Sequence, residues 1–259
     1  MKVKDVMSSD VITVDKDVNL REVLKLMKKH DITKIPVLED KKLIGVVTDN
    51  IIAVKLGSIR KKGVPASRLH ASSVTDKVFE TVSPDTDIIK ILKKVGEPGP
   101  TMLNVTVNDH LVGVVTKADL LPLVKSKKKL REIMNTKLHI VSSDDRVIHA
   151  RRIMIDEDVA RLPVIDDGKL VGIISDNEIA FALAKLKRSY SLGHQKHHLE
   201  ELLVSDAMKS PAIWTEPNMS AVDSAKIMIN NNIGFLPIVE NNQLKGIVTR
   251  TDILKTIDF

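Results

Sequence analysis

Leu162-Pro163-Val164, followed by Leu170-Val171-Gly172-Ile173-Ile174-Ser175, is the stretch that decides the fold. The same arrangement returns as Ile35-Pro36-Val37 with Leu43-Ile44-Gly45-Val46-Val47-Thr48, and again as Leu236-Pro237-Ile238 with Leu244-Lys245-Gly246-Ile247-Val248-Thr249. In each copy the glycine follows the proline by 9 residues, and a methionine precedes the proline by 29 residues. Two spacings held constant across three copies indicate an internal repeat.

A fourth, less regular copy lies in the sequence between the copies that contain Pro36 and Pro163. It keeps Leu111-Val112-Gly113-Val114-Val115-Thr116 but carries Asn104 in place of the proline. The copies are numbered one to four along the chain. Copies one and three end in Thr48-Asp49-Asn50-Ile51 and Ser175-Asp176-Asn177-Glu178, whereas copies two and four end in Thr116-Lys117-Ala118-Asp119 and Thr249-Arg250-Thr251-Asp252. This alternation indicates that a two-copy unit was duplicated. We therefore predict domains at residues 1–56, 71–125, 127–185 and 202–259.

Each copy has the pattern of a strand, a helix, two strands and a second helix. A short extended segment (residues 11–14 or 212–215) precedes an amphipathic helix with Leu20, Val23, Leu24 and Met27 at helical spacing. The two apolar strands flank a turn, which in copy three is Asp166-Asp167-Gly168. The predicted class is α/β, with four βαββα units arranged as two pseudo-twofold pairs.

Composition excludes several classes of function. The chain has 259 residues, of which 43% are hydrophobic and 29% charged, so it can bury a core. Aromatic residues are 2%, too few for a base-stacking platform, and the lack of cysteine excludes disulfides, thiolate zinc sites and cysteine nucleophiles. No apolar run approaches the ~18 residues needed to span a bilayer, and no secretory signal is visible. We expect a cytoplasmic protein without a membrane partner.

The charge is unevenly distributed. The net charge is +6, and basic residues crowd residues 60–62 and 125–131. Such runs are typical of solvated linkers, and less often of nucleic-acid contacts. Nucleic-acid binding through these basic linkers therefore stays open as an alternative function.

The repeated residues resemble cystathionine-β-synthase-type (CBS) domains, whose motif is an apolar-Pro-apolar strand followed by Gly-apolar-apolar-Thr/Ser-x-x-Asp. The resemblance covers nearly the whole chain as two tandem pairs, or Bateman modules. It implies that paired domains pack their sheets about a pseudo-twofold axis and bind adenosine-containing ligands (AMP, ADP, ATP or S-adenosylmethionine-like) in the two clefts between them. Either the four copies close one disc within the chain or two chains associate as a homodimer.

The resemblance also implies a role for the Thr/Ser-x-x-Asp motif. The Asp accepts hydrogen bonds from the ribose hydroxyls, and the Thr or Ser faces the ribose or phosphate. A carboxylate is an acceptor pair that suits a vicinal diol, and a helix N-terminus favours a phosphate. The alternative is a capping box, in which the Asp only satisfies free backbone amides.

Carried over to this sequence, the motif is uneven among the copies. Copy four is the most complete, copy two lacks the proline, copy three has a glutamate that is one methylene longer, and copy one has Ile51, which accepts no hydrogen bond. Trp214 either covers an adenine or plugs the core, and Lys34, Arg161 and Arg250 are candidates for phosphate contacts. The candidate ligand-binding residues are Thr249, Asp252, Trp214, Thr215, Phe235, Leu236, Pro237, Thr116, Asp119, Ser175, Glu178, Arg161 and Arg250.

No copy carries a nucleophile–base set, and the repeats occupy the chain, so we expect no enzyme activity and no catalytic residue. His194, His197 and His198 form either a metal site or, more simply, part of a solvated polar helix. The predicted function is a regulatory protein that senses an adenosine-containing ligand, with no cofactor and with an unidentified protein target. An interaction scaffold with vestigial clefts is the remaining alternative.

Overall fold

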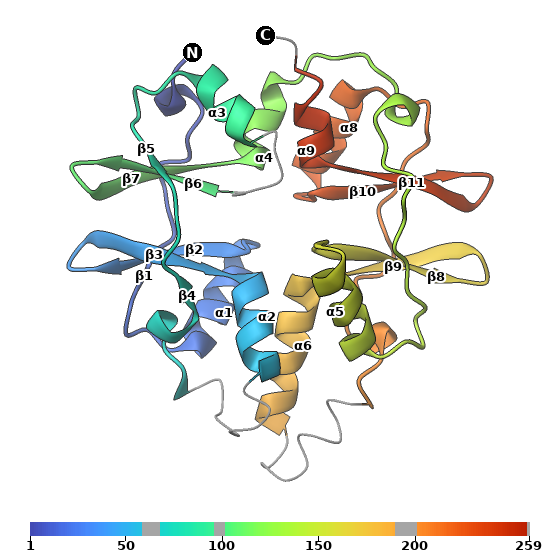
Figure 1. The fold of residues 1–259 in the computed structure, drawn as a ribbon, viewed down its shortest axis with the longest axis horizontal. Coiled ribbons are helices and arrows are strands. Elements are labelled where there is room, and N and C mark those ends of the chain that lie inside the picture. The colour runs from blue at the N-terminus through green and yellow to red at the C-terminus, as the bar shows by residue number, and fades with distance from the viewer. Residues whose placement is uncertain (59–67, 96–101, 190–200, 258–259) are drawn as a thin grey trace.

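The computed structural model describes residues 1–58, 68–95, 102–189 and 201–257. Each copy is built on an antiparallel two-stranded hairpin with helices on one side (Figure 1). The elements of copies one and two are η1 (Val3–Asp5), β1 (Val14–Asp15), α1 (Leu20–His30), β2 (Lys34–Glu39), β3 (Lys42–Thr48), α2 (Asp49–Ser58), η4 (Ala71–Val74), β4 (Thr75–Asp76), β5 (Thr81–Val82), α3 (Ile88–Val95), β6 (Met102–Val107), β7 (His110–Thr116), α4 (Lys117–Leu120) and η5 (Leu121–Leu123).

Copies three and four repeat this order along the chain. Their elements are η6 (Leu130–Glu132), α5 (Val147–Asp156), β8 (Arg161–Asp166), β9 (Lys169–Ser175), α6 (Asp176–Ser189), η7 (Val204–Asp206), α8 (Ala221–Asn230), β10 (Phe235–Glu240), β11 (Gln243–Thr249) and α9 (Arg250–Leu254).

The four hairpins share one register, which confirms the repeat. The residue that begins each hairpin pairs with the Thr or Ser that ends it, as in Arg161 with Ser175 and Phe235 with Thr249. The turn predicted at Asp167 and Gly168 is confirmed, because both residues have positive φ, as a two-residue type I′ turn requires. The other three hairpins have the same pair of positive-φ residues.

The first strand of each unit is shorter than predicted. Pairing in copy one starts only at Val14, and in copies three and four the extended segment makes one parallel bridge, Val141 with Val164 and Thr215 with Ile238. The backbone turns away after these contacts because the chain must reach the amphipathic helix within a few residues. A short 3₁₀ helix that the pattern did not predict opens each unit, and it buries an apolar side chain such as Val3 or Leu130.

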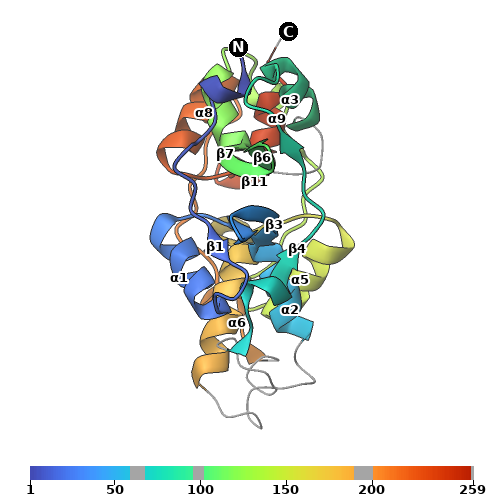
Figure 2. The same cartoon turned by 90° about the vertical axis from the view of Figure 1, so that its left-hand side faces the viewer.

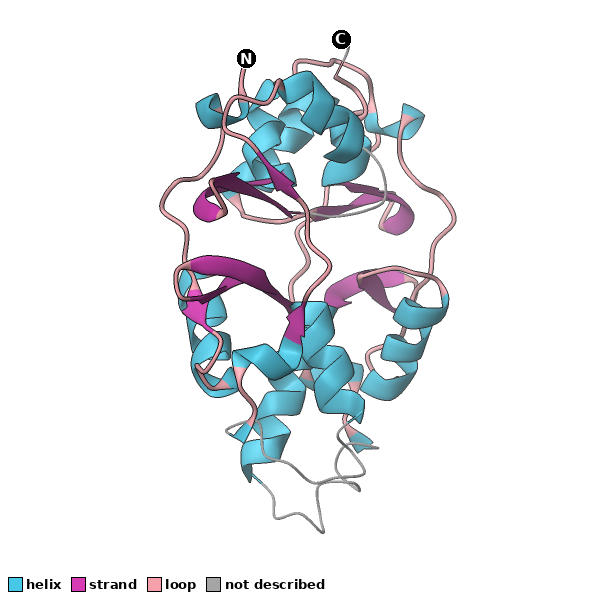
Figure 3. Cartoon of the chain, turned by 60° about the vertical axis from the view of Figure 1, so that its left-hand side comes forward, coloured by secondary structure: helices cyan, strands magenta, loops and turns pink. Residues whose placement is uncertain are grey.

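The strands form two inner layers and the helices cover their outer sides (Figures 2 and 3). One hydrophobic core combines copies one and three, and a second combines copies two and four. Helix α2 packs against α6, and α4 packs against α9. The four copies of a single chain therefore close one disc.

The repeated methionine and glycine are explained by contacts between the copies of a pair. A Cβ at Gly113, Gly172 or Gly246 would lie 2.7–2.8 Å from a methionine sulfur of the neighbouring copy. The sulfur atoms belong to Met7, Met208 and Met134 respectively. The fixed spacing thus preserves a close approach in which any side chain larger than glycine's would collide with the methionine.

Candidate nucleotide-binding clefts

Each cleft is assembled from both copies of a pair. The segment that enters one copy lies beside the second hairpin strand of its partner, through the bridges of Ser8 with Val114, Asn135 with Ile247, and Lys209 with Ile173. Strand β4 runs beside β3 in the same way. The acidic motif of one copy therefore faces the entering segment of the other copy.

A direct contact supports this arrangement. Ser8 Oγ, from copy one, donates a hydrogen bond to Asp119 Oδ1 of copy two at 2.9 Å. A motif followed along the sequence groups Phe235 with Asp252, because both belong to copy four. The arrangement of the strands corrects this, because it places them in the two different clefts of the same pair.

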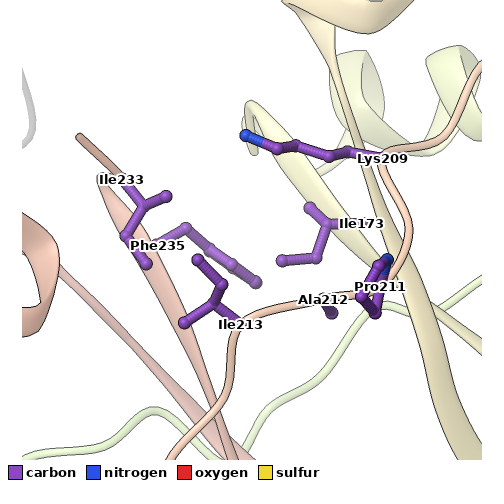
Figure 4. Close-up of a pocket in the computed structure, with 7 residues that line it drawn as sticks. All are labelled: Ile173, Lys209, Pro211, Ala212, Ile213, Ile233 and Phe235. Atoms are coloured by element: carbon purple, nitrogen blue, oxygen red, sulfur yellow. The ribbon is translucent and has the colours of Figure 1, made fainter. Parts of the chain in front are cut away.

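A pocket is open in the cleft between copies three and four (Figure 4). It is small: its volume as a cavity is about 40 Å³, and about 280 Å³ when the open solvent at its mouth is included. Its lining is Ile173 from copy three and Lys209, Pro211, Ala212, Ile213, Ile233 and Phe235 from copy four.

Ser175 follows Ile173 by two residues and so lies on the same face of β9. Its hydroxyl donates to the Glu178 carboxylate. We call this the Glu178 cleft: Ile173, Ser175 and Glu178 from copy three, with the pocket residues of copy four.

The Asp252 cleft is the other cleft of this pair. It comprises Ile247, Thr249 and Asp252 from copy four and Asn135 and Arg161 from copy three. Asn135 corresponds in position to the pocket residue Lys209, and Arg161 corresponds to Phe235. The Asp119 cleft of the first pair is built alike. Val114, Thr116 and Asp119 come from copy two, and Ser8 and Lys34 occupy the corresponding positions of copy one.

Thr249 and Asp252 form a capping box. Asp252 Oδ2 accepts from the Thr249 backbone amide at 2.8 Å and from its hydroxyl at 2.7 Å. Within the described ranges no group donates to Asp252 Oδ1, so the carboxylate caps the helix through one oxygen and has the other without a hydrogen bond. Thr116 and Asp119 form the same box, but there the second oxygen is held by Ser8.

Three residues predicted for copy four do not face a cleft. Leu236 is fully buried in the core of copies two and four. Thr215 is buried and its hydroxyl lies 3.0 Å from Met219 Sδ. Trp214 is 50% exposed and is not among the pocket residues, so it neither plugs the core nor covers the pocket. A fourth predicted residue of copy four, Pro237, is buried in β10 opposite Ile247 of the Asp252 cleft.

Four cations from the four copies influence one another at the centre of the disc. The pKa of Lys34 is lowered to about 8. Burial is the main cause, the attraction of Asp49 opposes it, and repulsion from Arg161, Lys117 and Arg250 adds to it. Burial and repulsion from Arg161 lower the pKa of Arg250 to about 10. Burial is the main cause of both shifts, and repulsion between the cations adds to it.

Existing contacts hold two of these cations in place. Lys117, which is 8% exposed, donates from Nζ to Thr251 Oγ1 at 2.6 Å. Arg250 donates to the Ile233 carbonyl at 3.2 Å and to Asn232 Oδ1 at 3.3 Å. Asn232 in turn donates to Asp31 Oδ2 at 2.8 Å, which links copies four and one.

Carboxylates occupy the equivalent helix starts of copies one and three. The pKa of Asp49 is raised, and that of Asp176 is raised to about 6, mainly because both carboxyl groups are buried. Asn50 Nδ2 donates a hydrogen bond to Asp176 Oδ2 at 3.0 Å. Asp49, Asp176 and Lys117 are not among the site residues predicted from the sequence. The sequence feature that could have identified them is the residue directly after the motif Thr or Ser, which alternates as Asp, Lys, Asp and Arg from copy one to copy four.

Two negative findings concern only the described ranges. No group of three or more His, Asp or Glu side chains there is arranged to hold a metal ion, and His194, His197 and His198 lie outside those ranges. No helix in the same ranges is long and apolar enough to cross a membrane.

Comparisons with known proteins agree with this architecture. Protein MJ1404 of Methanocaldococcus jannaschii is 27% identical over 98% of the chain, which spans 61% of that relative's length. Protein MJ1225 of the same organism, described as a proposed archaeal homologue of g-AMPK, has a crystal structure that superposes with a TM-score of 0.85 at 22% identity, covering 98% of this chain and 99% of that one. The CBS domain family matches residues 3–56, 71–126, 130–185 and 204–258, and the chain therefore belongs to the CBS domain family.

Proposed function

We propose that the protein is a non-enzymatic regulator that binds adenosine nucleotides in the Asp252 and Asp119 clefts. In each cleft the Asp carboxylate accepts hydrogen bonds from the ribose hydroxyls, and the phosphate points toward the central cations. The observation that carries the proposal is this group of Lys34, Arg161, Lys117 and Arg250. A bound phosphate would raise the lowered pKa values of Lys34 and Arg250 toward their ordinary values, and the attraction between phosphate and cations contributes to affinity.

The two clefts would differ in strength. Asp252 has a free carboxylate oxygen within the described ranges, whereas a ribose at Asp119 must displace the Ser8 hydroxyl. We therefore expect one tight and one weaker nucleotide per chain. The relation of MJ1225 to g-AMPK supports a regulatory role, which this chain would exert by changing the angle between its two pairs when a nucleotide binds.

Isothermal titration calorimetry with AMP, GMP and adenosine tests the proposal. We expect AMP to bind more tightly than either GMP or adenosine, because only AMP combines the adenine with a phosphate. A Lys34→Met variant should weaken AMP binding and leave adenosine binding unchanged. The proposal fails if AMP gives no heat, or if AMP and GMP bind equally.

A further inference from the structure

The basic segment between copies two and three has no part in the nucleotide clefts. It joins η5 to η6 at the end of the disc that carries both termini (Figure 1). Its lysines are all exposed: Lys125, Lys127, Lys128 and Lys129. We call these four the lysine row. A solvated linker would leave its backbone to water, so the backbone contacts of the segment distinguish a linker from a built surface.

The backbone of the lysine row is anchored to α8. The carbonyls of Ser126 and Lys128 accept hydrogen bonds from the second and the first amide of α8, at 3.0 and 2.9 Å. Two carbonyls that lie two residues apart and face the same neighbour are typical of an extended chain. The first amides of a helix have no partner within the helix. The segment therefore satisfies these donors of α8, and α8 in turn fixes the segment in place.

The charge of the lysine row is not neutralised within the described ranges. No carboxylate there forms an ion pair with any of the four lysines. The nearby acids have other partners, since Glu240 lies 3.7 Å from Arg131 and Asp223 of α8 accepts a hydrogen bond from Lys226 at 2.9 Å. An extended chain rises ~3.3 Å per residue, so the lysine row presents positive charge over roughly 13 Å.

The surroundings of the row favour the phosphates of a nucleic-acid duplex as its partner. In residues 124–131 the apolar side chains, Val124 and Leu130, are buried, so this segment offers no apolar anchor for a membrane or a protein. No residue from 122 to 132 is aromatic, whereas proteins that bind single strands stack the bases on aromatic rings. Each strand of a duplex carries one phosphate per ~3.4 Å, so the row spans three to four phosphates.

We propose that the lysine row binds the sugar–phosphate backbone of a nucleic-acid duplex without reading its sequence. Each lysine contacts a phosphate, and the anchoring on α8 holds the charges in place before binding. Contacts to phosphate position a protein on a duplex but carry no sequence information. This role goes beyond the proposed function and is independent of it, because none of the four lysines belongs to a nucleotide cleft.

Fluorescence anisotropy of the intact protein with a labelled DNA duplex, measured over a series of salt concentrations, tests the proposal. Three to four phosphate contacts predict that the logarithm of the binding constant falls with the logarithm of the salt concentration with a slope of about −2.7 to −3.6. Binding should therefore weaken about 40- to 150-fold between ~50 and ~200 mM salt. A duplex of different sequence should bind equally well.

A charge-removing variant locates the binding surface. It should lose most of the duplex affinity at low salt and most of the salt dependence, while keeping its melting temperature and its heat of AMP binding. The unchanged AMP heat separates this inference from the proposed function. The variant combines Lys125→Gln, Lys127→Gln, Lys128→Gln and Lys129→Gln.

A matched control removes the same charge from exposed lysines of copy one, on α1 and at the tip of its hairpin. It should bind the duplex nearly as tightly as the wild type, because salt screens charges that lie more than about 10 Å from the contact. The control combines Lys28→Gln, Lys29→Gln, Lys41→Gln and Lys42→Gln.

Several results would overturn the inference. An equal loss in both variants would show that net charge attracts the duplex, and no loss in the first variant would place binding elsewhere. Absence of duplex binding at low salt, or a salt slope near zero for the wild type, would exclude the phosphate contacts whether or not a variant folds. Tighter binding of a single strand, or of vesicles rich in phosphatidylserine, would exclude the duplex as the preferred partner.

Discussion

Replacing Asp252 by Asn tests whether the capping carboxylate also holds a ligand. In the variant the amide oxygen can replace Oδ2 in the bonds from the Thr249 amide and hydroxyl, which are 2.8 and 2.7 Å in the protein. The amide NH₂ group then takes the place of Oδ1 and presents a donor to the ribose hydroxyls. The charge-assisted bonds to ribose are lost, whereas the cap is kept.

The loss can be estimated from the type of bond. Hydrogen bonds to charged groups contribute about 1.5–3 kcal/mol each. At about 1.4 kcal/mol per tenfold change, AMP should bind the Asp252 cleft roughly 10- to 150-fold more weakly. The free energy of unfolding without ligand should change by less than ~0.5 kcal/mol, since Asn is also a good capping residue.

Calorimetry with AMP and urea unfolding without ligand, on one preparation, measure both quantities. Asp119→Asn is the matched control, because Ser8 already occupies its second oxygen, and we expect a smaller loss there. Wild-type affinity in both variants would refute the ribose role and leave a purely structural cap. A large loss of stability with Asp252→Asn would instead show that the variant disturbs the fold.

Three further predictions follow from single contacts. Ser8→Ala should tighten AMP binding at the Asp119 cleft several-fold in calorimetry, because it removes a hydroxyl that competes with the ribose. Asp176→Asn should stabilise the ligand-free protein near pH 7. Burial raises the pKa of Asp176 to about 6, so the wild-type protein gains stability as the pH falls from about 7 through 6. The variant lacks this gain, and melting curves measured against pH will show the difference. Gly246→Ala should destabilise the protein by about 1–3 kcal/mol in urea unfolding, because its Cβ would lie 2.7 Å from Met134 Sδ; an unchanged midpoint would contradict this close packing.

The features that the sequence predicted correctly are local or periodic. The hairpins, the turn at Asp167 and Gly168, and the Thr249 cap depend on residues a few positions apart, and their repetition made them identifiable. The candidate acids Asp119 and Asp252 were also found this way. Their capping geometry is confirmed, while their role in binding stays a prediction.

The composition of the clefts was not predictable from the same pattern. Ser8 and Asp119 are 111 residues apart, and no spacing within a copy indicates that they meet. A motif read along one copy assigns Phe235 to Asp252, whereas strand pairing across copies assigns it to Ser175 and Glu178. The sequence also offered two positions for Trp214, over an adenine or in the core, whereas the side chain is 50% exposed.

The duplication explains why charge is concentrated at the centre of the disc. Equivalent helices pack together, α2 with α6 and α4 with α9, so Asp49 lies near Asp176 and Lys117 donates to the residue that follows Arg250. Like charges are thereby brought together, and their repulsion adds to burial, which is the main cause of the shifted pKa values of Lys34, Asp176 and Arg250. The proposed phosphate site among these cations lies at the junction of all four copies. If a phosphate binds there, its binding energy would depend on how the two pairs are placed relative to each other, which is the property that a ligand-controlled regulator requires.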